Sequence, residues 1–167
     1  MSLTAVVEIP DAEAARALGR ALARELRAGD LVLLSGPLGA GKTTLTQGIG
    51  EGLGVRGQVA SPTFIIARVH PPLADGPALV HVDAYRLESL DELEALDLDA
   101  SLEDSVTVVE WGEGLAEVLA EDRLEITLER PQGEVSDPEH ADRGPRRATI
   151  RALGARWQGV SLPGAAA

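Results

Sequence analysis

The chain has 167 residues with a formal net charge of −12, and its sequence contains no cysteine. This length predicts one domain with a core of its own, and the lack of cysteine excludes disulfides, cysteine-based zinc sites and thiol nucleophiles. No apolar run approaches the roughly 18 residues that suggest a membrane span, and the first residues lack the pattern of a signal peptide, so we expect a cytoplasmic protein without membrane contact.

The first predicted helix covers residues 12–28. Asp11 is a suitable N-cap, leucines recur every four residues along the segment, and Gly29 follows as a stop signal. The next segment, residues 31–34, is entirely apolar, which is typical of a strand buried on both faces.

A glycine-rich segment separates this strand from a second predicted helix. Residues 36–43 match the P-loop pattern G-x-x-x-x-G-K-[ST], and an apolar stripe at helical spacing runs on from Leu45 until Gly54. The glycines let successive backbone N–H groups point into one concavity, and the helix N-terminus adds a positive potential. The predicted nucleotide-binding residues here are Gly36, Leu38, Gly39, Ala40, Gly41, Lys42, Thr43 and Thr44.

Lys42 is the only lysine among the 15 lysine and arginine residues. Because a compact ammonium and a planar guanidinium are not interchangeable, this choice supports a site that needs a point charge. In a P-loop, Lys42 would reach the β- and γ-phosphates and the Thr43 hydroxyl would hold Mg²⁺. The alternative is a glycine-rich turn that binds nothing.

Three further strands are predicted in the middle of the chain. Residues 64–69 and 78–82 are joined by a turn too short for a parallel crossover, so we expect them to pair antiparallel. Residues 106–109 form another apolar run. Asp83 and Glu110 directly follow the second and third of these runs, at the sheet edge where open α/β folds bind ligands.

Asp83 and Glu110 are both candidates for the acid that holds Mg²⁺ or its water shell beside a P-loop. The sequence does not rank them. Each also has a plain structural interpretation, because Asp83 can cap a turn and Glu110 can cap the short helix predicted at 113–120.

Residues 83–125 hold 15 of the chain's 27 acidic residues but only two basic ones. A weak apolar stripe predicts a helix at 89–104, and a solvated helix face is the plainest interpretation of the acids. A docking surface for a basic partner is the alternative. A broad nucleic-acid surface would need the opposite sign.

The last predicted elements are a hairpin of residues 124–129 and 147–151 with a long polar loop at 131–145. Its arginines indicate either a solvated hairpin surface or a contact with tRNA or a protein partner. The arginines in question are Arg143, Arg146, Arg147, Arg151 and Arg156. We expect residues 1–157 to form a single domain and residues 158–167 a flexible tail.

The elements together predict the α/β class. The expected architecture is a three-layer P-loop NTPase fold, in which helices flank a mixed, partly antiparallel sheet. A guanine-specific N-K-x-D motif is absent from the sequence, which favours ATP as the nucleotide.

Four short segments resemble the bacterial TsaE (YjeE) family in their order and spacing. They are residues 35–45 with the P-loop, 61–64 (SPTF), 81–87 (HVDAYRL) and 109–111 (VEW). The P-loop alone is generic, whereas the H-x-D-x-Y-R and E-W pieces at this spacing are specific. The resemblance covers roughly residues 8–130.

The resemblance implies a small, slow P-loop ATPase that serves the synthesis of threonylcarbamoyladenosine (t6A) in tRNA. Such a protein acts with the TsaD–TsaB pair, meets tRNA through that pair, and does not itself transfer the threonylcarbamoyl group. ATP and Mg²⁺ are its implied cofactors. Thr43 and Glu110 would ligate the metal, while Asp83 would hold a metal-bound water or orient the attacking one. Lys42, Asp83 and Glu110 would be the catalytic residues.

The same resemblance implies roles for residues around the nucleotide. Thr63 would belong to a switch-like loop, residues 55–63, near the γ-phosphate. Trp111 would pack close to the nucleotide, with a core anchor as the alternative. Thr4 or Asp11 would approach the adenine.

Two more residues near the predicted site have competing interpretations. Arg86 can stabilise the transition state of phosphoryl transfer, or it can form a salt bridge with a neighbour such as Glu88. His81 lies within an apolar strand, where a histidine is more often a hydrogen-bonded core residue than a catalyst.

Two other functions remain compatible with the sequence. One is a small-molecule kinase, in which Arg143, Arg146 and Arg147 would close over the phosphates as a lid. The other is a nucleotide-gated binding module that never hydrolyses its ligand, against which the two acids Asp83 and Glu110 argue.

Overall fold

The computed structural model describes six stretches of the chain: residues 2–36, 41–55, 67–83, 103–110, 122–129 and 146–163. Several predicted segments lie outside them, namely 64–66, 89–102, 113–120 and the loop at 131–145. Five predicted site residues also lie outside the described stretches: Leu38, Gly39, Ala40, Thr63 and Trp111.

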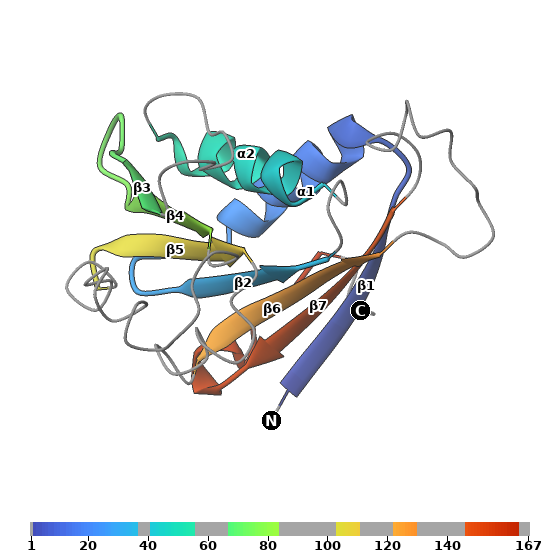
Figure 1. Ribbon diagram of the computed structural model, residues 1–167. Coiled ribbons are helices and arrows are strands. Elements are labelled where there is room, and N and C mark those ends of the chain that lie inside the picture. Colours follow the sequence, from blue (N-terminus) through green and yellow to red (C-terminus); the bar gives the residue numbers. More distant parts are fainter. Residues whose placement is uncertain are drawn as a thin grey trace.

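A seven-stranded mixed sheet forms the centre of the molecule, with its strands in the order β1-β7-β6-β2-β5-β4-β3 (Figure 1). The strands are β1 (Ser2–Ile9), β2 (Leu31–Ser35), β3 (Ala67–His70), β4 (Ala78–Asp83), β5 (Ser105–Glu110), β6 (Arg123–Glu129) and β7 (Arg146–Leu153). Strands β6, β2, β5 and β4 are parallel, and antiparallel strands border them on both sides. The predicted α/β class with a mixed sheet is therefore confirmed.

The burial of each strand follows its sequence pattern. Every residue of β5, and all but the last of β2, is buried, as expected for mostly apolar parallel strands inside a sheet. Along β6 and β7, buried residues alternate with more exposed ones, because these strands cover the core with one face. The predicted β6–β7 hairpin and the antiparallel pairing of β3 with β4 are both confirmed.

Strand β1 is an element that the sequence pattern did not reveal. It pairs antiparallel with β7 at the edge of the sheet. Val6 and Val7 are adjacent apolar residues, and Val6 is 50% exposed, so the alternation that marks a half-buried strand is blurred. Thr4 of β1 pairs with Arg151 of β7. Strands β7 and β6 lie between β1 and β2, the strand that leads into the predicted P-loop.

Helix α1 (Ala12–Ala23) begins where predicted and ends earlier. The Asp11 carboxylate accepts a hydrogen bond from the Ala14 N–H at 2.8 Å, so Asp11 acts as the helix cap. The predicted end near residue 28 is wrong because regular helix stops at Ala23. The leucine spacing continues past that point, since the N–H of Leu26 still donates to the carbonyl of Leu22 at 3.1 Å.

Helix α2 (Lys42–Leu53) packs directly on α1 through glycines. A Cβ on Gly48 would overlap the carbonyl oxygen of Arg16, and a Cβ on Gly19 would overlap that of Leu45. These obstacles are backbone atoms, which cannot swing aside as a flexible side chain can. The two glycines therefore set the position of α2, and with it the end of the P-loop.

We expect Gly48→Ala to lower the free energy of unfolding by about 1–3 kcal/mol, because the added methyl group must push α2 away from α1. Chemical denaturation without nucleotide measures this change. The matched control is Glu51→Ala on the same helix, which removes an exposed ion pair with Arg20 at 3.0 Å. Such a pair contributes less than about 1 kcal/mol, so equal losses in the two variants would contradict the close-packing argument.

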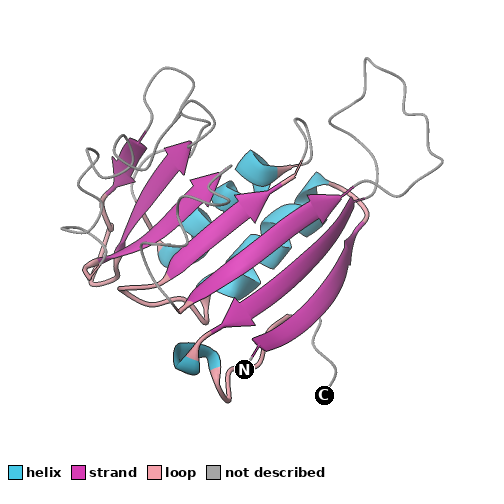
Figure 2. Cartoon of the chain, turned by 60° about the horizontal axis from the view of Figure 1, so that its bottom comes forward, coloured by secondary structure: helices cyan, strands magenta, loops and turns pink. Residues whose placement is uncertain are grey.

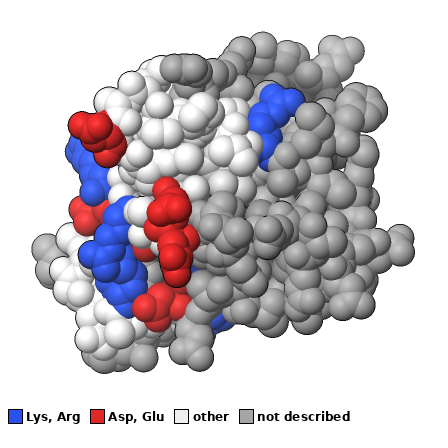
Figure 3. All heavy atoms as spheres, turned by 90° about the vertical axis from the view of Figure 1, so that its left-hand side faces the viewer, with Lys and Arg blue, Asp and Glu red and all other residues white. Residues whose placement is uncertain are grey.

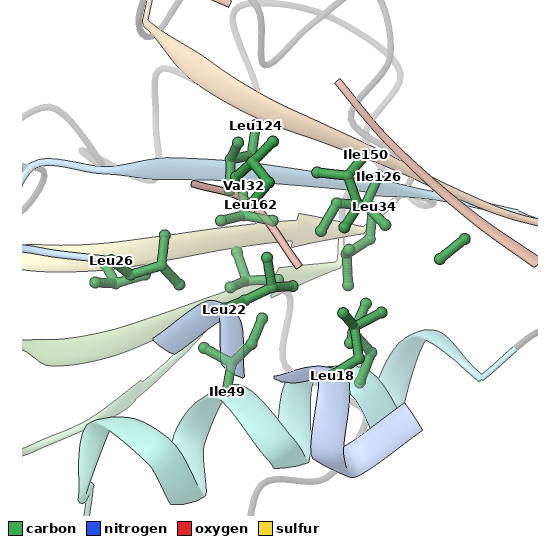
Figure 4. Packing of buried hydrophobic residues seen from close by; sticks show 14 of the residues in the cluster. Leu18, Leu22, Leu26, Val32, Leu34, Ile49, Leu124, Ile126, Ile150 and Leu162 are labelled. Carbon is green, nitrogen blue, oxygen red and sulfur yellow. The ribbon is translucent and has the colours of Figure 1, made fainter. Parts of the chain in front are cut away.

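The core lies between the two α-helices and one face of the sheet (Figure 4). The labelled side chains in the figure come from α1, the connection after it, α2, three strands and the C-terminal segment. They are Leu18, Leu22, Leu26, Val32, Leu34, Ile49, Leu124, Ile126, Ile150 and Leu162. The predicted helices and strands thus share one continuous apolar cluster.

The C-terminal segment also joins this core. Trp157 lies in a short 3₁₀ helix (Ala155–Trp157) and is 3% exposed, as is Leu162. Val160 packs against the same cluster. The expectation of a flexible tail from residue 158 therefore does not hold at Leu162, because its side chain is part of the core.

Both α-helices lie on the same face of the sheet (Figure 2). The helices predicted at 89–104 and 113–120, which would supply the third layer, fall almost wholly outside the described residues. Within the stretches that the structure describes, neither helix is long and apolar enough to cross a membrane.

Candidate functional site

The predicted phosphate-binding loop connects the end of β2 to the start of α2. Strand β2 ends at Ser35, Gly36 follows it, and Gly41 is the N-cap of α2. Among the described residues, the first turn of α2 has no side-chain cap and no acidic residue. Such a helix N-terminus presents backbone N–H groups and a positive potential, both of which favour an anion.

Gly41 requires glycine for its conformation. Its φ is 99° and its ψ is 17°, a region that a residue with a Cβ adopts only with strain. Its carbonyl accepts the Leu45 N–H at 2.9 Å and starts the hydrogen bonding of the helix. The second glycine of the motif thus turns the chain from loop into helix.

Lys42 reaches from α2 back to the beginning of the loop. Its Nζ donates to the carbonyl oxygen of Gly36 at 2.6 Å, and the residue is 6% exposed. A buried ammonium is stabilised by nearby oxygens, and charged acceptors form stronger hydrogen bonds with it than a neutral carbonyl does. Thr43 and Thr44 follow on the same turn and are half-buried.

Three parallel strands end side by side next to this loop. The register pairs Leu34 of β2 with Glu110 of β5, and Glu110 with Asp83 of β4. Neighbouring strands are about 4.8 Å apart, so the backbones of both acids lie at one level beside the strand that enters the loop. Glu110 is on the adjacent strand and Asp83 one strand further, an order that the sequence left open.

Glu110 is buried, with 3% of its surface exposed, although it carries a carboxylate. Its Oε2 lies 2.8 Å from Nε2 of His81, which is fully buried. His81 was expected to be a core histidine, and its burial agrees with that expectation. The sequence did not indicate that its partner is a predicted site residue.

Glu110 and Asp83, the acids that end β5 and β4, are predicted to hold Mg²⁺ or its water shell beside a nucleotide. Among the described residues, no group of three or more histidines and acids could hold a metal ion. Mg²⁺ commonly takes one or two carboxylates and completes its shell with phosphates and water. Glu110 on β5 and Thr43 at the start of α2 carry oxygen atoms of the kind that Mg²⁺ binds, and the backbone of Asp83 ends β4 at the level of Glu110.

Arg156 of the C-terminal segment makes hydrogen bonds within the fold. Its Nε and one terminal nitrogen donate to the two carboxylate oxygens of Asp30, both at 3.0 Å, and that nitrogen also donates to the Glu25 carbonyl at 2.6 Å. Its guanidinium lies 4.3 Å from the ring centre of Trp157. Arg156 therefore ties the C-terminal segment to the connection between α1 and β2.

The hairpin arginines have local partners as well. Arg147 bonds Glu8 of β1 at 2.8 Å, and a terminal nitrogen of Arg151 lies 3.9 Å from Glu125. Arg146 is 6% exposed, whereas Arg143 lies outside the described residues. On the face shown in Figure 3, described acidic and basic side chains lie close together on the left, and one basic side chain lies apart from them at the upper right. These observations favour a solvated hairpin surface over a basic patch for tRNA.

Other predicted interactions cannot be placed. Arg86 and Glu88 lie outside the described residues, as do most acids of the stretch 83–125. The structure describes the backbone of Asp83, which ends β4. The predicted roles of Arg86, Thr63 and Trp111 stay predictions.

A family model described as "Threonylcarbamoyl adenosine biosynthesis protein TsaE" matches residues 9–137. This range starts at the end of β1 and includes the P-loop, both acidic strand ends and strand β6. It agrees closely with the range over which the short motifs carry the resemblance.

Curated proteins and a solved structure are similar to the chain over most of its length. A protein from Streptomyces coelicolor named tRNA threonylcarbamoyladenosine biosynthesis protein TsaE is 65% identical over 143 residues, 85% of this chain and 93% of that protein. A protein of the same name from Bacillus subtilis is 38% identical over 148 residues, 87% of this chain and 84% of that protein. The crystal structure of Bacillus subtilis YdiB has a TM-score of 0.69 and 31% identity, covering 95% of this chain and 91% of that one.

Proposed function

The chain belongs to the TsaE family, and from this premise we propose that it is a magnesium-dependent P-loop ATPase acting in t6A modification of tRNA. In this proposal it hydrolyses ATP slowly, works as a partner of the TsaD–TsaB complex, and reaches tRNA through that complex. In the modification it acts through the change between its ATP-bound and ADP-bound states, and it transfers no chemical group itself.

The register of three strand ends is the observation that carries this proposal. Glu110 and Asp83 end β5 and β4 at one level, and Leu34 on β2 is paired with Glu110 just before the glycine loop. Acids at this place can hold a metal and a water close to phosphates cradled by the loop. The arrangement therefore supports hydrolysis rather than nucleotide binding alone.

Lys42 has a specific part in nucleotide binding. Its ammonium donates a hydrogen bond to the Gly36 carbonyl oxygen at 2.6 Å. Phosphate oxygens form stronger, charge-assisted hydrogen bonds with an ammonium than a carbonyl does. We expect the ammonium to exchange the carbonyl for the β- and γ-phosphates when ATP binds, while Thr43 and Glu110 hold the accompanying Mg²⁺.

A small-molecule kinase is supported less well. The sequence suggested that Arg143, Arg146 and Arg147 could form a lid over the phosphates. Arg146 is buried in β7, and Arg147 is bonded to Glu8 on β1. Two of the three arginines therefore interact within the sheet, which disfavours a role for them in a mobile lid.

The experiment that separates these functions measures ATP hydrolysis by the purified chain, alone and with the TsaD–TsaB pair. Parallel reactions contain candidate small-molecule phosphate acceptors. Mg²⁺-dependent release of inorganic phosphate, increased by TsaD–TsaB, would support the proposal. Transfer of the γ-phosphate to an acceptor would support the kinase, and binding of ATP without turnover would support a gated binding module.

We also expect the chain to bind TsaD–TsaB at least about tenfold more tightly with ATP than with ADP, because γ-phosphate contacts can order a loop that hydrolysis releases. Thr63→Ala should narrow this difference, since Thr63 would sense the γ-phosphate. Val6→Ala, at an exposed position of the edge strand β1, is the control and should leave it unchanged. Affinities in the two states that agree within about threefold would reject the switch.

A further inference from the structure

His81 and Glu110 form a buried contact at the end of β5, where we propose that the metal is held. The two side chains are 0% and 5% exposed, and Nε2 of His81 lies 2.8 Å from Oε2 of Glu110. Removing a carboxylate from water without a hydrogen-bond donor costs several kcal/mol. The imidazole is therefore an important donor to the Glu110 carboxylate within the core.

The strand register explains how His81 reaches Glu110 without occupying the sheet edge. His81 on β4 pairs with Val108 on β5, and Asp83 pairs with Glu110. Glu110 is two residues beyond Val108, so its side chain and that of His81 are diagonal neighbours on the same face of the sheet. Diagonal neighbours on adjacent strands are within reach of long side chains. The histidine thus holds one carboxylate oxygen from the interior, and the other oxygen can serve a ligand at the edge.

We infer that His81 is a positioning residue for magnesium: it fixes the carboxylate of Glu110 so that its second oxygen can hold the metal or a metal-bound water. This inference rests on the proposed ATPase function. Hydrogen-bond partners of metal ligands orient those ligands, and their loss commonly weakens metal binding 10–100-fold, by the order-of-magnitude rule for such partners.

The tautomer that this role needs follows from the contact. An ionised carboxylate only accepts hydrogen bonds, so Nε2 of His81 must carry the proton. Nδ1 is buried without a partner among the described residues. A neutral imidazole protonated at Nε2 is therefore sufficient, and the positioning role needs no change in the charge of His81.

A purely structural role is the competing explanation. In that case His81 only satisfies a buried carboxylate, and its loss lowers stability without changing how the folded protein uses Mg²⁺. The positioning role instead predicts a change in Mg²⁺ dependence that is separate from any change in stability or in metal-free nucleotide binding.

Two amide substitutions distinguish these explanations. In His81→Gln the amide nitrogen can occupy the place of Nε2, whereas in His81→Asn the shorter side chain cannot reach Glu110. His70→Asn is the matched control, because His70 is also a buried strand histidine (4% exposed) but lies on the edge strand β3. For each protein, binding of a fluorescent ATP analogue is titrated with Mg²⁺ and also measured in EDTA, and thermal unfolding is recorded without ligand.

We expect His81→Asn to raise the half-saturating Mg²⁺ concentration by about 10–100-fold, with metal-free binding of the analogue unchanged within about threefold. His81→Gln and His70→Asn should stay within about threefold of wild type in both measurements. Equal Mg²⁺ dependence of His81→Asn and wild type would overturn the inference and leave the ATPase proposal standing. A wild-type chain that binds no nucleotide would overturn both.

A measurement on the unmodified protein tests the required tautomer, whether or not His81→Asn folds. Nitrogen-15 NMR of the imidazoles, with His81 assigned by its absence from the His81→Gln spectrum, reports which ring nitrogen carries the proton. We expect a proton on Nε2 both without ligand and with Mg²⁺ and a non-hydrolysable ATP analogue. A proton on Nδ1 alone in the loaded protein would overturn the inference, because Nε2 could then no longer donate to Glu110.

Discussion

Replacing Lys42 with methionine should lower the affinity for ATP on the order of 100-fold while the fold is kept, because truncating one member of a buried charge pair costs about 2–5 kcal/mol. Methionine keeps the apolar stem that is buried beside the loop and removes the ammonium that donates to Gly36. Lys42→Arg should also fail, since a planar guanidinium is larger and cannot replace a compact ammonium in this position. Calorimetric titration with ATP measures the affinity, and thermal unfolding reports the fold.

Arg24→Ala is the control for the loss of one positive charge. Arg24 is exposed and follows the last turn of α1, where Ala23 lies against Gly52 near the far end of α2. Its removal should change ATP affinity by less than about threefold, because exposed charges at a distance are screened by salt. Wild-type affinity in Lys42→Met would contradict the assignment of the P-loop.

The composition of the chain allows a direct observation of the same residue. Because Lys42 is the only lysine, carbon-13 labelling of lysine at Cε alone gives a single side-chain signal. Binding of ATP should shift that signal as the ammonium leaves the Gly36 carbonyl for phosphate oxygens. A signal that stays in place while ATP binds would show that the nucleotide is held elsewhere.

The elements that the sequence predicts well are those determined by local patterns. The mostly apolar runs that became β2 and β5 and the leucine stripe of α1 depend on residues close together in the chain. The P-loop is also local, because it is defined by two glycines, a lysine and a threonine between a strand and a helix. The carboxyl ends of parallel strands meet at one edge, so the proximity of Asp83 and Glu110 could be predicted as well.

The features that the sequence did not reveal depend on distant partners. Strand β1 is stabilised by pairing with β7, at the other end of the chain, and its own alternation is too weak to indicate a strand. Leu162 is buried because the C-terminal segment folds back on the core, helped by the bonds from Arg156 to Asp30. The contact of His81 with Glu110 requires the register of β4 against β5, which no motif states.

The end of α1 shows that leucine spacing alone does not predict where a helix stops. The leucine spacing continues to Leu26, and that residue is buried, although regular helix ends at Ala23. Asp30 accepts a hydrogen bond from the Arg27 N–H at 2.7 Å and also pairs with Arg156. The side-chain interactions of Asp30 stabilise the turn into β2, so a spacing rule predicted the buried residue but not the backbone around it.

Glu110→Gln should reduce Mg²⁺-dependent ATP hydrolysis by about 10²–10³-fold, the usual cost of removing a group that stabilises developing charge in a transition state. Glutamine keeps the shape of the side chain and an oxygen that can accept from His81, so the buried contact survives while the negative charge is lost. Binding of ATP in EDTA should change by less than about threefold, because the carboxylate acts through the metal and the attacking water. Single-turnover hydrolysis and metal-free binding measure the two quantities.

The matched control is Glu125→Gln on β6, which flanks β2 on the side opposite β5. Glu125 is paired with Arg123 at 2.9 Å and is partly exposed, so its substitution should leave hydrolysis within about twofold of wild type.

Asp83→Asn then ranks the two acids, of which Glu110 lies one strand from β2 and Asp83 lies two strands from it. If Glu110 is the main metal ligand, Glu110→Gln raises the Mg²⁺ requirement more than Asp83→Asn does, whereas Asp83→Asn lowers the rate at saturating Mg²⁺ through the orientation of water. Normal hydrolysis in both variants would mean that the acids only terminate their strands, and the reaction would need a different set of residues.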